Sequence, residues 1–512
     1  MIQQNGIIIL DFGSQYNQLI ARRVREMGVY AEILPFRTSI EEIKQKNPSG
    51  IILSGGPSSV YAENAYHVDP KVFELGIPIL GICYGMQLTA HLLGGKVQRG
   101  EKGQYGKTSF SHQNNSDLFK EVPTSSTVWM SRFDQVITPP SGFEIIGMAD
   151  GVISAIADRQ KKIFAVQFHP EVTHSEFGDR ILLNFVENLC LSPKNWKLDD
   201  YISTTVSDIK EKVGDKKVIL GLSGGVDSSV AAILIHKAIG DQLTCIFVDT
   251  GLLRLNEGDK VMQAYGENFK VNIKRVDASG QFMDALKGIS DPEEKRKIIG
   301  REFVQVFDAQ AKQMTDASFL AQGTIYPDVI ESVSVHGPSA TIKSHHNVGG
   351  LPKEMNLQLL EPLRELFKDE VRKVGVSLGI APELVYRHPF PGPGLGIRIL
   401  GEVSQEKVEI LQKADDIFIQ ELYKNDLYDK VSQAFVVLLP VKSVGVMGDE
   451  RTYEYTAVVR SANTIDFMTA TWSKLPYEFL ETVSSRIINE VKGINRVTYD
   501  ISSKPPATIE WE

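Results

Sequence analysis

Short apolar runs alternate with stretches of helical periodicity along the first half of the chain. The runs that we expect to form strands lie at 7–10, 51–53, 79–82, 163–168, 218–222, 243–248 and 271–276. Runs of this length between helical segments are typical of buried strands in a parallel sheet. The series is interrupted near 191–197, where Ser192, Pro193 and Asn195 break the pattern. We therefore expect two successive α/β domains, each with a largely parallel sheet.

A proline- and glycine-rich segment marks a second change of pattern. Neither a helix nor a central strand accommodates Pro389-Phe390-Pro391-Gly392-Pro393-Gly394. Beyond it, helical periodicity and β-rich runs occur at 405–424, 434–441, 455–460 and 476–491. We expect this tail to be a smaller α+β domain. The predicted domains are therefore 1–195, 196–388 and 389–512.

Composition narrows the class of partners. The 512 residues carry 55 Lys and Arg against 64 Asp and Glu, and this net charge of −9 disfavours a nucleic-acid or anionic-membrane surface. The first residues lack a basic stretch followed by an apolar one, and the apolar runs are too short to span a bilayer. Three cysteines cannot all pair, which suits a reducing compartment. We expect a cytoplasmic protein that binds small anionic molecules.

Cys83 stands where a predicted strand meets a predicted helix. The strand ends in Gly81-Ile82-Cys83-Tyr84-Gly85, and helical periodicity follows from Met86 to Leu93. Glycines on both sides permit a tight turn, and a helix N-terminus stabilises a thiolate. An arbitrary intracellular cysteine is more often buried and structural, and we give that interpretation to Cys190 and Cys245. At Cys83 the glycine-flanked turn favours a nucleophile instead.

A second motif supplies partners for this thiol. His169 and Glu171 are two residues apart in a segment that we expect to be extended, so their side chains should point the same way. Glu171 can then orient the imidazole that serves Cys83 as base and afterwards as acid. Backbone N–H groups of Gly56 and Tyr84 could stabilise an oxyanion. This set of groups suits the cleavage of an amide.

Four motifs in this region resemble those of class I, triad-type glutamine amidotransferases. They are Asp11 to Tyr16, Ser54 to Pro57, Gly81 to Gln87 and Gln167 to Val172. The resemblance implies that Cys83 attacks the side-chain amide of glutamine, which gives a glutamyl thioester and ammonia. It also implies that Gln87 helps to hold glutamine.

A glycine- and serine-rich loop follows the strand expected at 218–222. It consists of Ser223, Gly224, Gly225, Val226, Asp227, Ser228 and Ser229, and it leads into a helical pattern over 230–239. Successive amides and hydroxyls at a helix N-terminus form an anion site, and Asp227 can carry Mg²⁺ against phosphates. The alternative is a turn that only caps the helix. The loop resembles the PP-loop of ATP pyrophosphatases, which implies ATP as a substrate and pyrophosphate as a product.

The loop alone leaves the acceptor of the adenylyl group open. PP-loop enzymes act on nicotinate dinucleotide, citrulline and tRNA bases as well as on xanthosine monophosphate (XMP). Further segments, at 291–300, 343–350, 387–394 and 503–512, are similar to those of glutamine-hydrolysing GMP synthetases. This resemblance implies that ATP adenylates O2 of XMP, pyrophosphate leaves, and ammonia displaces AMP to give GMP.

The same resemblance implies roles for residues outside the two motifs. Those implied in binding XMP, or in closure over it, are Arg296, Lys343, Gln433, Arg496, Lys504, Ile509 and Glu510. Asp328 and Glu331 match a mobile lid over the synthetase site. A solvated helix face with alternating charges is the alternative for Arg296. The last domain resembles a dimerisation module, which implies a homodimer.

Two other classes of function are weighed against an enzyme. A glutaminase with a regulatory domain would keep Cys83, His169 and Glu171 but lose an intact phosphate loop. A nucleotide-binding sensor would tolerate loss of the triad. Because both motifs are intact, an enzyme is favoured. Within enzymes, the alternative is glutamine-dependent amination of another adenylated nucleotide or base.

Overall fold

The computed structural model describes residues 5–113, 116–332, 357–447, 450–464, 467 and 469–512. Their contacts divide the described residues into two compact units: the first holds residues up to Tyr201 together with 327–332, and the second holds 202–326 and the described residues from 357 onward. No helix in these ranges is long and apolar enough to cross a membrane. Of the residues singled out above, Lys343 lies outside the described ranges.

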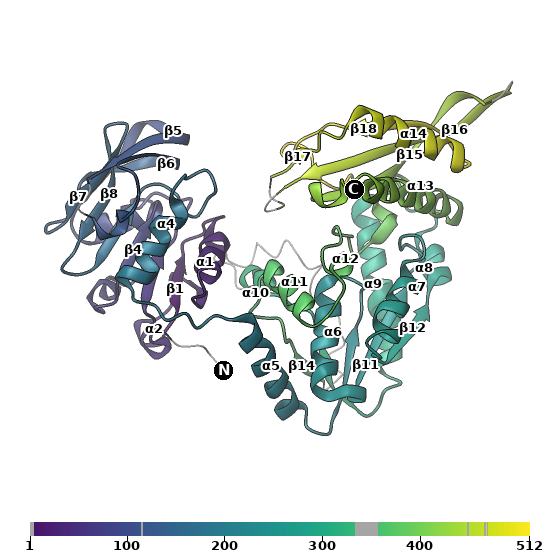
Figure 1. Ribbon diagram of the computed structural model, residues 1–512, viewed down its shortest axis with the longest axis horizontal. Helices are drawn as coiled ribbons and strands as arrows, with labels where there is room; N and C mark the ends of the chain where they lie inside the picture. Colours follow the sequence, from purple (N-terminus) through teal and green to yellow (C-terminus); the bar gives the residue numbers. More distant parts are fainter. Residues whose placement is uncertain (1–4, 114–115, 333–356, 448–449, 465–466, 468) are drawn as a thin grey trace. The chain divides into compact units, whose positions relative to one another are not determined.

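The first unit is built on a mixed sheet (Figure 1). In the described part of the chain its order is β2-β1-β3-β4-β9-β8-β7-β5-β6, parallel from β2 to β9 and antiparallel beyond. The strands are β1 Ile7–Asp11, β2 Ala31–Pro35, β3 Gly50–Leu53, β4 Ile79–Ile82, β5 Lys96–His112, β6 Ser125–Thr138, β7 Glu144–Ala149, β8 Val152–Asp158 and β9 Ile163–Val166. The helices are α1 Asn17–Glu26, α2 Ile40–Lys46, η1 Pro70–Glu74, α3 Tyr84–Leu92, η2 Asp117–Phe119, α4 Gly178–Leu183 and η3 Asn184–Leu189.

The parallel strands of this sheet position the predicted catalytic residues. Every residue of β1, β3, β4 and β9 is buried, as expected for short apolar strands in the middle of a sheet. Parallel strands end at the same edge, and in open α/β sheets ligands bind at that edge. The chain leaving β3, β4 and β9 carries Gly56, Cys83 and His169 in turn. Three motifs that are distant in sequence therefore meet there.

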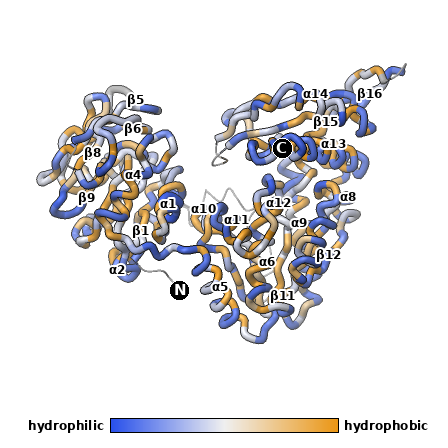
Figure 2. Tube along the Cα trace, in the orientation of Figure 1, coloured by the Kyte–Doolittle hydropathy of each residue, from blue (hydrophilic) through white to orange (hydrophobic). Residues whose placement is uncertain are grey.

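The second unit begins with a parallel five-stranded sheet. Its order in the described ranges is β12-β11-β10-β13-β14. The strands are β10 Lys217–Gly221, β11 Leu243–Asp249, β12 Ile273–Asp277, β13 Ala317–Ala321 and β14 Gln358–Leu360. The helices along residues 198–385 are α5 Leu198–Val213, α6 Val226–Ile239, η4 Gly240–Gln242, α7 Glu257–Val261, η5 Met262–Glu267, α8 Ser279–Leu286, α9 Pro292–Ala311, α10 Tyr326–Ser332, α11 Lys368–Ser377 and α12 Pro382–Val385. Helix α6, which follows β10 after the loop 222–225, is hydrophobic along most of its length (Figure 2).

The carboxyl-terminal part adds a sheet covered by two long helices (Figure 1). β15 and β17 flank β16 in antiparallel pairs, and β18 runs parallel to β16. The elements are η6 Gly394–Ile397, α13 Gln405–Lys424, η7 Tyr428–Lys430, β15 Gln433–Met447, β16 Glu450–Asn463, β17 Thr471–Trp472, α14 Tyr477–Glu490 and β18 Ile494–Asp500. One hydrophobic core joins Ile246 of β11 and Phe307 of α9 to Phe418 of α13 and Val436 of β15. The boundary at 388/389 thus stays a prediction.

The predicted fold class is confirmed: an α/β chain with parallel-rich sheets and a smaller carboxyl-terminal part that contains antiparallel strands. Helix α13 spans the predicted 405–424, because Ser404 caps it by accepting from the Lys407 N–H. The antiparallel half of the first sheet was not foreseen. Its strand β6 alternates buried positions with partly or fully exposed ones and so shows no continuous apolar run.

Candidate active sites

Cys83 lies on the turn between β4 and α3 in a strained conformation. Its φ of 52° and ψ of −102° fall outside the regions that residues with a side chain normally occupy. The flanking glycines permit this turn. A Cβ on Gly81 would lie 2.6 Å from the carbonyl O of Gly85, and a Cβ on Gly85 would lie 2.3 Å from the carbonyl O of Leu53. The turn places the thiol at the start of α3, where the helix dipole favours a thiolate.

His169 and Glu171 lie in the turns that follow β9. His169 Nδ1 is 2.7 Å from Glu171 Oε1, and both side chains are almost wholly buried. Burial disfavours the charged imidazole, but the charges of Glu171 and Cys83 outweigh it and raise the pKa of His169 well above its ordinary value. The segment is not extended, yet the carboxylate and the imidazole face each other. The pair can hold a proton beside Cys83.

One amide at the start of α3 is free to bind an oxyanion. Gly85 N donates to Ser54 O, and the amides of Met86 and Gln87 donate to Cys83 O. Of the first four amides of the helix, only that of Tyr84 has no such acceptor in the described part of the chain. Gly56 lies against the same residue, since a Cβ on it would be 3.2 Å from the ring carbon Cγ of Tyr84.

The side chain of Gln87 already has partners inside the protein. Its Nε2 donates to the backbone O of Asp134 at 3.0 Å and to Gln167 Oε1 at 3.3 Å. Sequence reasoning missed Arg132, a buried cation on β6. Burial lowers the pKa of Arg132, and the nearby charge of Cys83 opposes that shift. No motif surrounds Arg132, so its position beside the thiol could be found only in three dimensions.

The phosphate loop joins β10 to α6. Gly224 has a φ of 71°, which only glycine adopts readily. Ser228 Oγ accepts from the Ser223 N–H at 3.2 Å and lies 2.9 Å from Ser223 Oγ, so the two hydroxyls fix the loop. A Cβ on Gly323, after β13, would lie 3.0 Å from the Ser228 N. The loop is therefore held at the amino end of α6, a position that favours phosphate.

Asp227 in this loop faces a lysine that sequence reasoning missed. Lys368, at the start of α11, donates to Asp227 Oδ2. Asp227 Oδ1 is buried and has no partner in the described ranges. A buried carboxylate oxygen without a partner fits a cation such as Mg²⁺, which proteins often bind through one carboxylate and substrate phosphates. No cluster of three or more His, Cys, Asp or Glu residues in those ranges could hold a metal by itself.

The carboxyl-terminal residues are fixed by buried cations. Glu510 accepts from Arg398 and from Gln433, and Glu512 Oε2 accepts from Lys295 Nζ at 2.5 Å. Arg296 donates to the backbone O of Glu512. Ile509 is buried, and Lys504 Nζ donates to Phe467 O at 2.7 Å. The structure thus brings Gln433 and Glu510 into contact and places Arg296 on the end of the same segment. Arg398 carried no sequence motif that singled it out.

Arg496 lies apart from this group. It is exposed on β18 and pairs with Thr456, whereas Gln433 pairs with Ala462, farther along β16. At about 3.3 Å per residue, these positions are roughly 20 Å apart along the strand. Asp328 and Glu331 lie on α10, and Asp328 is half-buried.

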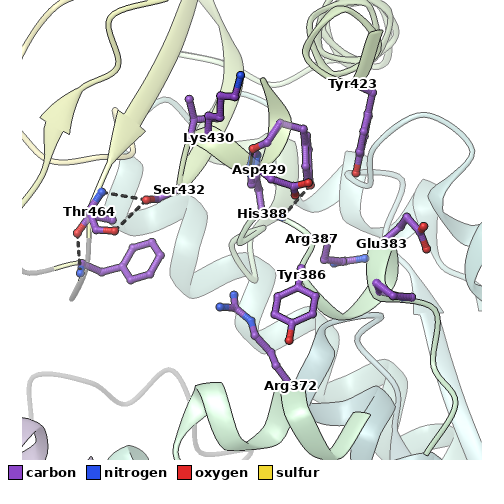
Figure 3. Close-up of a pocket in the computed structure, with 14 residues that line it drawn as sticks. Arg372, Glu383, Tyr386, Arg387, His388, Tyr423, Asp429, Lys430, Ser432 and Thr464 are labelled. Carbon is purple, nitrogen blue, oxygen red and sulfur yellow. Dashed lines mark hydrogen bonds between the residues drawn. The ribbon is translucent and has the colours of Figure 1, made fainter. Parts of the chain in front are cut away.

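A cavity of about 540 Å³ lies between the segments around α12 and the start of β15 (Figure 3). Its cations are Arg372, Arg387 and Lys430, its carboxylates are Glu383 and Asp429, and Ser432 and Thr464 add hydrogen-bonding groups. The buried ring of His388 stacks on Tyr428 with centroids 3.8 Å apart. Burial is the main cause that lowers the pKa of His388 to about 4. Three cations outnumber two carboxylates in this lining, and together with the aromatic rings and hydroxyls they suit a phosphorylated nucleoside.

Comparison with known proteins agrees with this architecture. The model of the class-I glutamine amidotransferases matches residues 8–189, that of NAD synthase matches 169–296, and that of the GMP synthase C-terminal domain matches 420–511. A protein of Fusobacterium nucleatum named GMP synthase [glutamine-hydrolyzing] is 66% identical over 100% of both chains. Proteins of the same name from Spiroplasma kunkelii and Aquifex aeolicus are 60% and 57% identical, over 99% and 100% of both chains.

The fold and the two sites define a class I glutamine amidotransferase joined to an ATP-using synthetase of the PP-loop type. The chain belongs to the family of glutamine-hydrolysing GMP synthases, which are ATP-dependent ligases.

Proposed function

We propose that this chain makes GMP from XMP, ATP and glutamine, with Cys83, His169 and Glu171 releasing ammonia and the loop around Asp227 binding ATP. Membership in the family supports the overall reaction. The observation that carries the proposal is the presence, on one chain, of a thiol beside a buried Glu171–His169 pair and of a phosphate loop at the start of α6.

The first half-reaction takes place at the turn that carries Cys83. Cys83 Sγ attacks the side-chain carbonyl carbon of glutamine while His169 takes the thiol proton. The N–H groups of Tyr84 and Gly56 stabilise the resulting oxyanion. His169 then gives the proton to the leaving nitrogen, so ammonia departs and a thioester remains. Water attacks the thioester with His169 as base and releases glutamate, while Glu171 holds the imidazole in place.

The second half-reaction uses the phosphate loop. O2 of XMP attacks the α-phosphorus of ATP, and the bond to pyrophosphate breaks. Ammonia then attacks C2, and AMP leaves with O2, which gives GMP. Backbone amides of Gly224, Gly225 and Val226 and the hydroxyls of Ser223, Ser228 and Ser229 bind the phosphates. Lys368, which contacts Asp227, adds positive charge next to them.

Asp227 would hold Mg²⁺ together with the phosphates of ATP, and the bound ion would neutralise charge on the departing pyrophosphate. We assign XMP binding to Gln433, Glu510, Arg296, Lys504 and Ile509. Support comes from the contact of Gln433 with Glu510 and from the position of the others on or beside the last residues of the chain. Lys343 and Arg496 are assigned to XMP, and Asp328 and Glu331 to a lid, by resemblance alone.

The nucleotide phosphate of XMP is proposed to enter the cavity lined by Arg372, Arg387 and Lys430. Ser432 at its wall directly precedes Gln433, and Phe467, which also lines it, accepts from Lys504. A phosphate next to these cations gains charge-assisted hydrogen bonds. The cavity and the Gln433–Glu510 pair would then bind opposite ends of one nucleotide.

We further propose a homodimer formed through the carboxyl-terminal part. The hairpin of β15 and β16 carries apolar side chains at Val441, Val444, Val446 and Tyr453, all more than half exposed. A strip of this kind is typical of a surface covered in an assembly. Val444→Glu combined with Val446→Glu should shift the protein from dimer to monomer in sedimentation, and an unchanged dimer would contradict this. We also propose that the protein is located in the cytoplasm, which agrees with its three free thiols. Its proposed domains are 1–195, 196–388 and 389–512.

The experiment that tests the function compares purine nucleotides as triggers of ATP cleavage. With ammonium as nitrogen donor, XMP should drive ATP to AMP and pyrophosphate with one GMP formed for each AMP. IMP and GMP should not. Cleavage to ADP and phosphate, or equal stimulation by IMP, would contradict the proposal.

A further inference from the structure

Arg398 is a fully buried cation in the second unit that contacts two aromatic rings. Its guanidinium carbon lies 4.1 Å from the ring centroid of Phe435 and 5.1 Å from that of Phe390. A second cation, Arg254, lies 5.2 Å from the centroid of the same Phe390 ring. The four side chains form a cluster of two cations and two aromatic rings. Because each ring presents its π electrons to a guanidinium, the cluster helps to fix the position of Arg398.

From this position Arg398 binds Glu510 with two donors. Its Nη2 donates to Oε1 at 2.8 Å and its Nε donates to Oε2 at 3.1 Å. Gln433 Nε2 donates to Oε1 at 2.7 Å. A forked contact of this kind fixes the plane of a carboxylate as well as its distance. The Glu510 side chain is 18% exposed, so one edge of this fixed group still faces outward.

The bonds already made determine what Glu510 can accept. A carboxylate offers about four lone-pair sites, two on each oxygen. Arg398 and Gln433 use both sites on Oε1, and Arg398 uses one on Oε2. Within the contacts of the described residues, one site on Oε2 is left. It can accept one N–H, and its direction is set by Arg398.

We propose that Arg398 is a positioning residue that aims this last acceptor site of Glu510 at a ring N–H of the purine, and so sets the preference for a purine nucleotide that carries such an N–H. The inference rests on the proposed XMP site. Because Arg398 is fully buried, we infer that it acts through Glu510, and that Phe390 acts through Arg398.

The test is Arg398→Lys, which keeps the charge but loses the fork. For the wild type we expect XMP to be preferred over N1-methylated XMP by about tenfold or more in kcat/KM with ammonium. In the variant this preference should fall to about twofold, through a KM for XMP that rises about tenfold while kcat at saturating XMP changes little. Phe390→Leu should lower the preference in the same direction but by less.

Arg460→Lys is the matched control. Arg460 is also fully buried and also binds the last segment, but through backbone carbonyls of Ser502, Thr508 and Ile509 instead of the Glu510 carboxylate. It should lower thermal stability and leave the preference for XMP unchanged. The inference is overturned if Arg398→Lys keeps the wild-type preference, or if Arg460→Lys loses it equally. A wild type that makes no GMP from XMP would instead refute the proposed function.

Discussion

Glu171 Oε1 lies 2.7 Å from His169 Nδ1, and this contact leaves Nε2 of the imidazole as the nitrogen that can exchange a proton with Cys83. Both side chains are buried, so neither is screened by water. The Glu171 carboxylate therefore stabilises the positive charge of the imidazole during the thiol chemistry. The same attraction contributes to the stability of the folded protein.

The stability supplied by this pair should depend on pH. The pKa of His169 is raised in the folded protein, despite burial, by the charges of Glu171 and Cys83. A group whose pKa is raised by folding stabilises the folded state. This stabilisation is complete below the pKa of the unfolded chain, about 6.5 for histidine, and is lost as the pH rises through the pKa of the folded protein. Glu171→Gln removes the main attraction. The gap in melting temperature between wild type and this variant should be widest near pH 6 and narrow toward pH 9 in calorimetry.

A double variant provides the control for that experiment. In a His169→Gln background, the melting-temperature gap caused by Glu171→Gln should lose the part of its pH dependence that comes from titration of the imidazole, because that partner is absent. A gap that widens as pH rises would refute the charge assignment.

The three cysteines should differ sharply in reactivity. Burial raises the pKa of Cys245 to about 12 and raises that of Cys190 even further, so neither forms a thiolate near neutral pH. Iodoacetamide at pH 7.5 should label Cys83 alone in the native protein and all three cysteines after denaturation. Peptide mass spectrometry gives the sites. Labelling of Cys190 or Cys245 in the native protein at the rate of Cys83 would contradict the account.

Lys368 should act in the synthetase reaction only. Lys368→Met removes the cation beside Asp227, so XMP-dependent pyrophosphate release should fall by about 10²-fold with either nitrogen donor. Lys373→Met, on the exposed side of the same helix, is the control and should leave the rate unchanged. Equal rates for the two variants in a pyrophosphate assay would show that Lys368 plays no part.

The turn at Cys83 should not tolerate a methyl group at Gly85. Gly85→Ala places a Cβ 2.3 Å from the Leu53 carbonyl O, so the turn must move and glutamine hydrolysis should be lost. Gly300→Ala, on α9, meets no atom within 4 Å. That control should stabilise the protein by about 0.5–1 kcal/mol, since alanine is the better helix former. Retention of glutaminase activity in Gly85→Ala would mean that the turn at Cys83 is not the site of glutamine hydrolysis.

Local pattern determined which features the sequence could predict. The turn at Cys83 needs only glycines four residues apart, and Glu171 lies two residues from His169. The helix at 405–424 has its own cap at Ser404. All of these are short-range features. The buried strands were visible as well, because each is a continuous apolar run.

Contacts between distant segments could not be predicted. Lys368 meets Asp227 across 141 residues, and Arg398 meets Glu510 across 112. The sequence around Lys368 or Arg398 does not indicate which distant carboxylate either side chain will contact. The long strands β5 and β6 were missed because their exposed polar positions interrupt any apolar run.

The central claim is that ammonia made at Cys83 is used on XMP in the same enzyme. The most direct test supplies amide-¹⁵N glutamine, ATP and XMP, with unlabelled ammonium, to wild type and to Cys83→Ala. Wild type should place ¹⁵N in the 2-amino group of GMP, with one glutamate for each labelled GMP and with one AMP and one pyrophosphate for each GMP, labelled or unlabelled. Cys83→Ala should form only unlabelled GMP, at the ammonium-dependent rate of the wild type. Labelled GMP from Cys83→Ala, or ADP and phosphate from the wild type, would contradict the account.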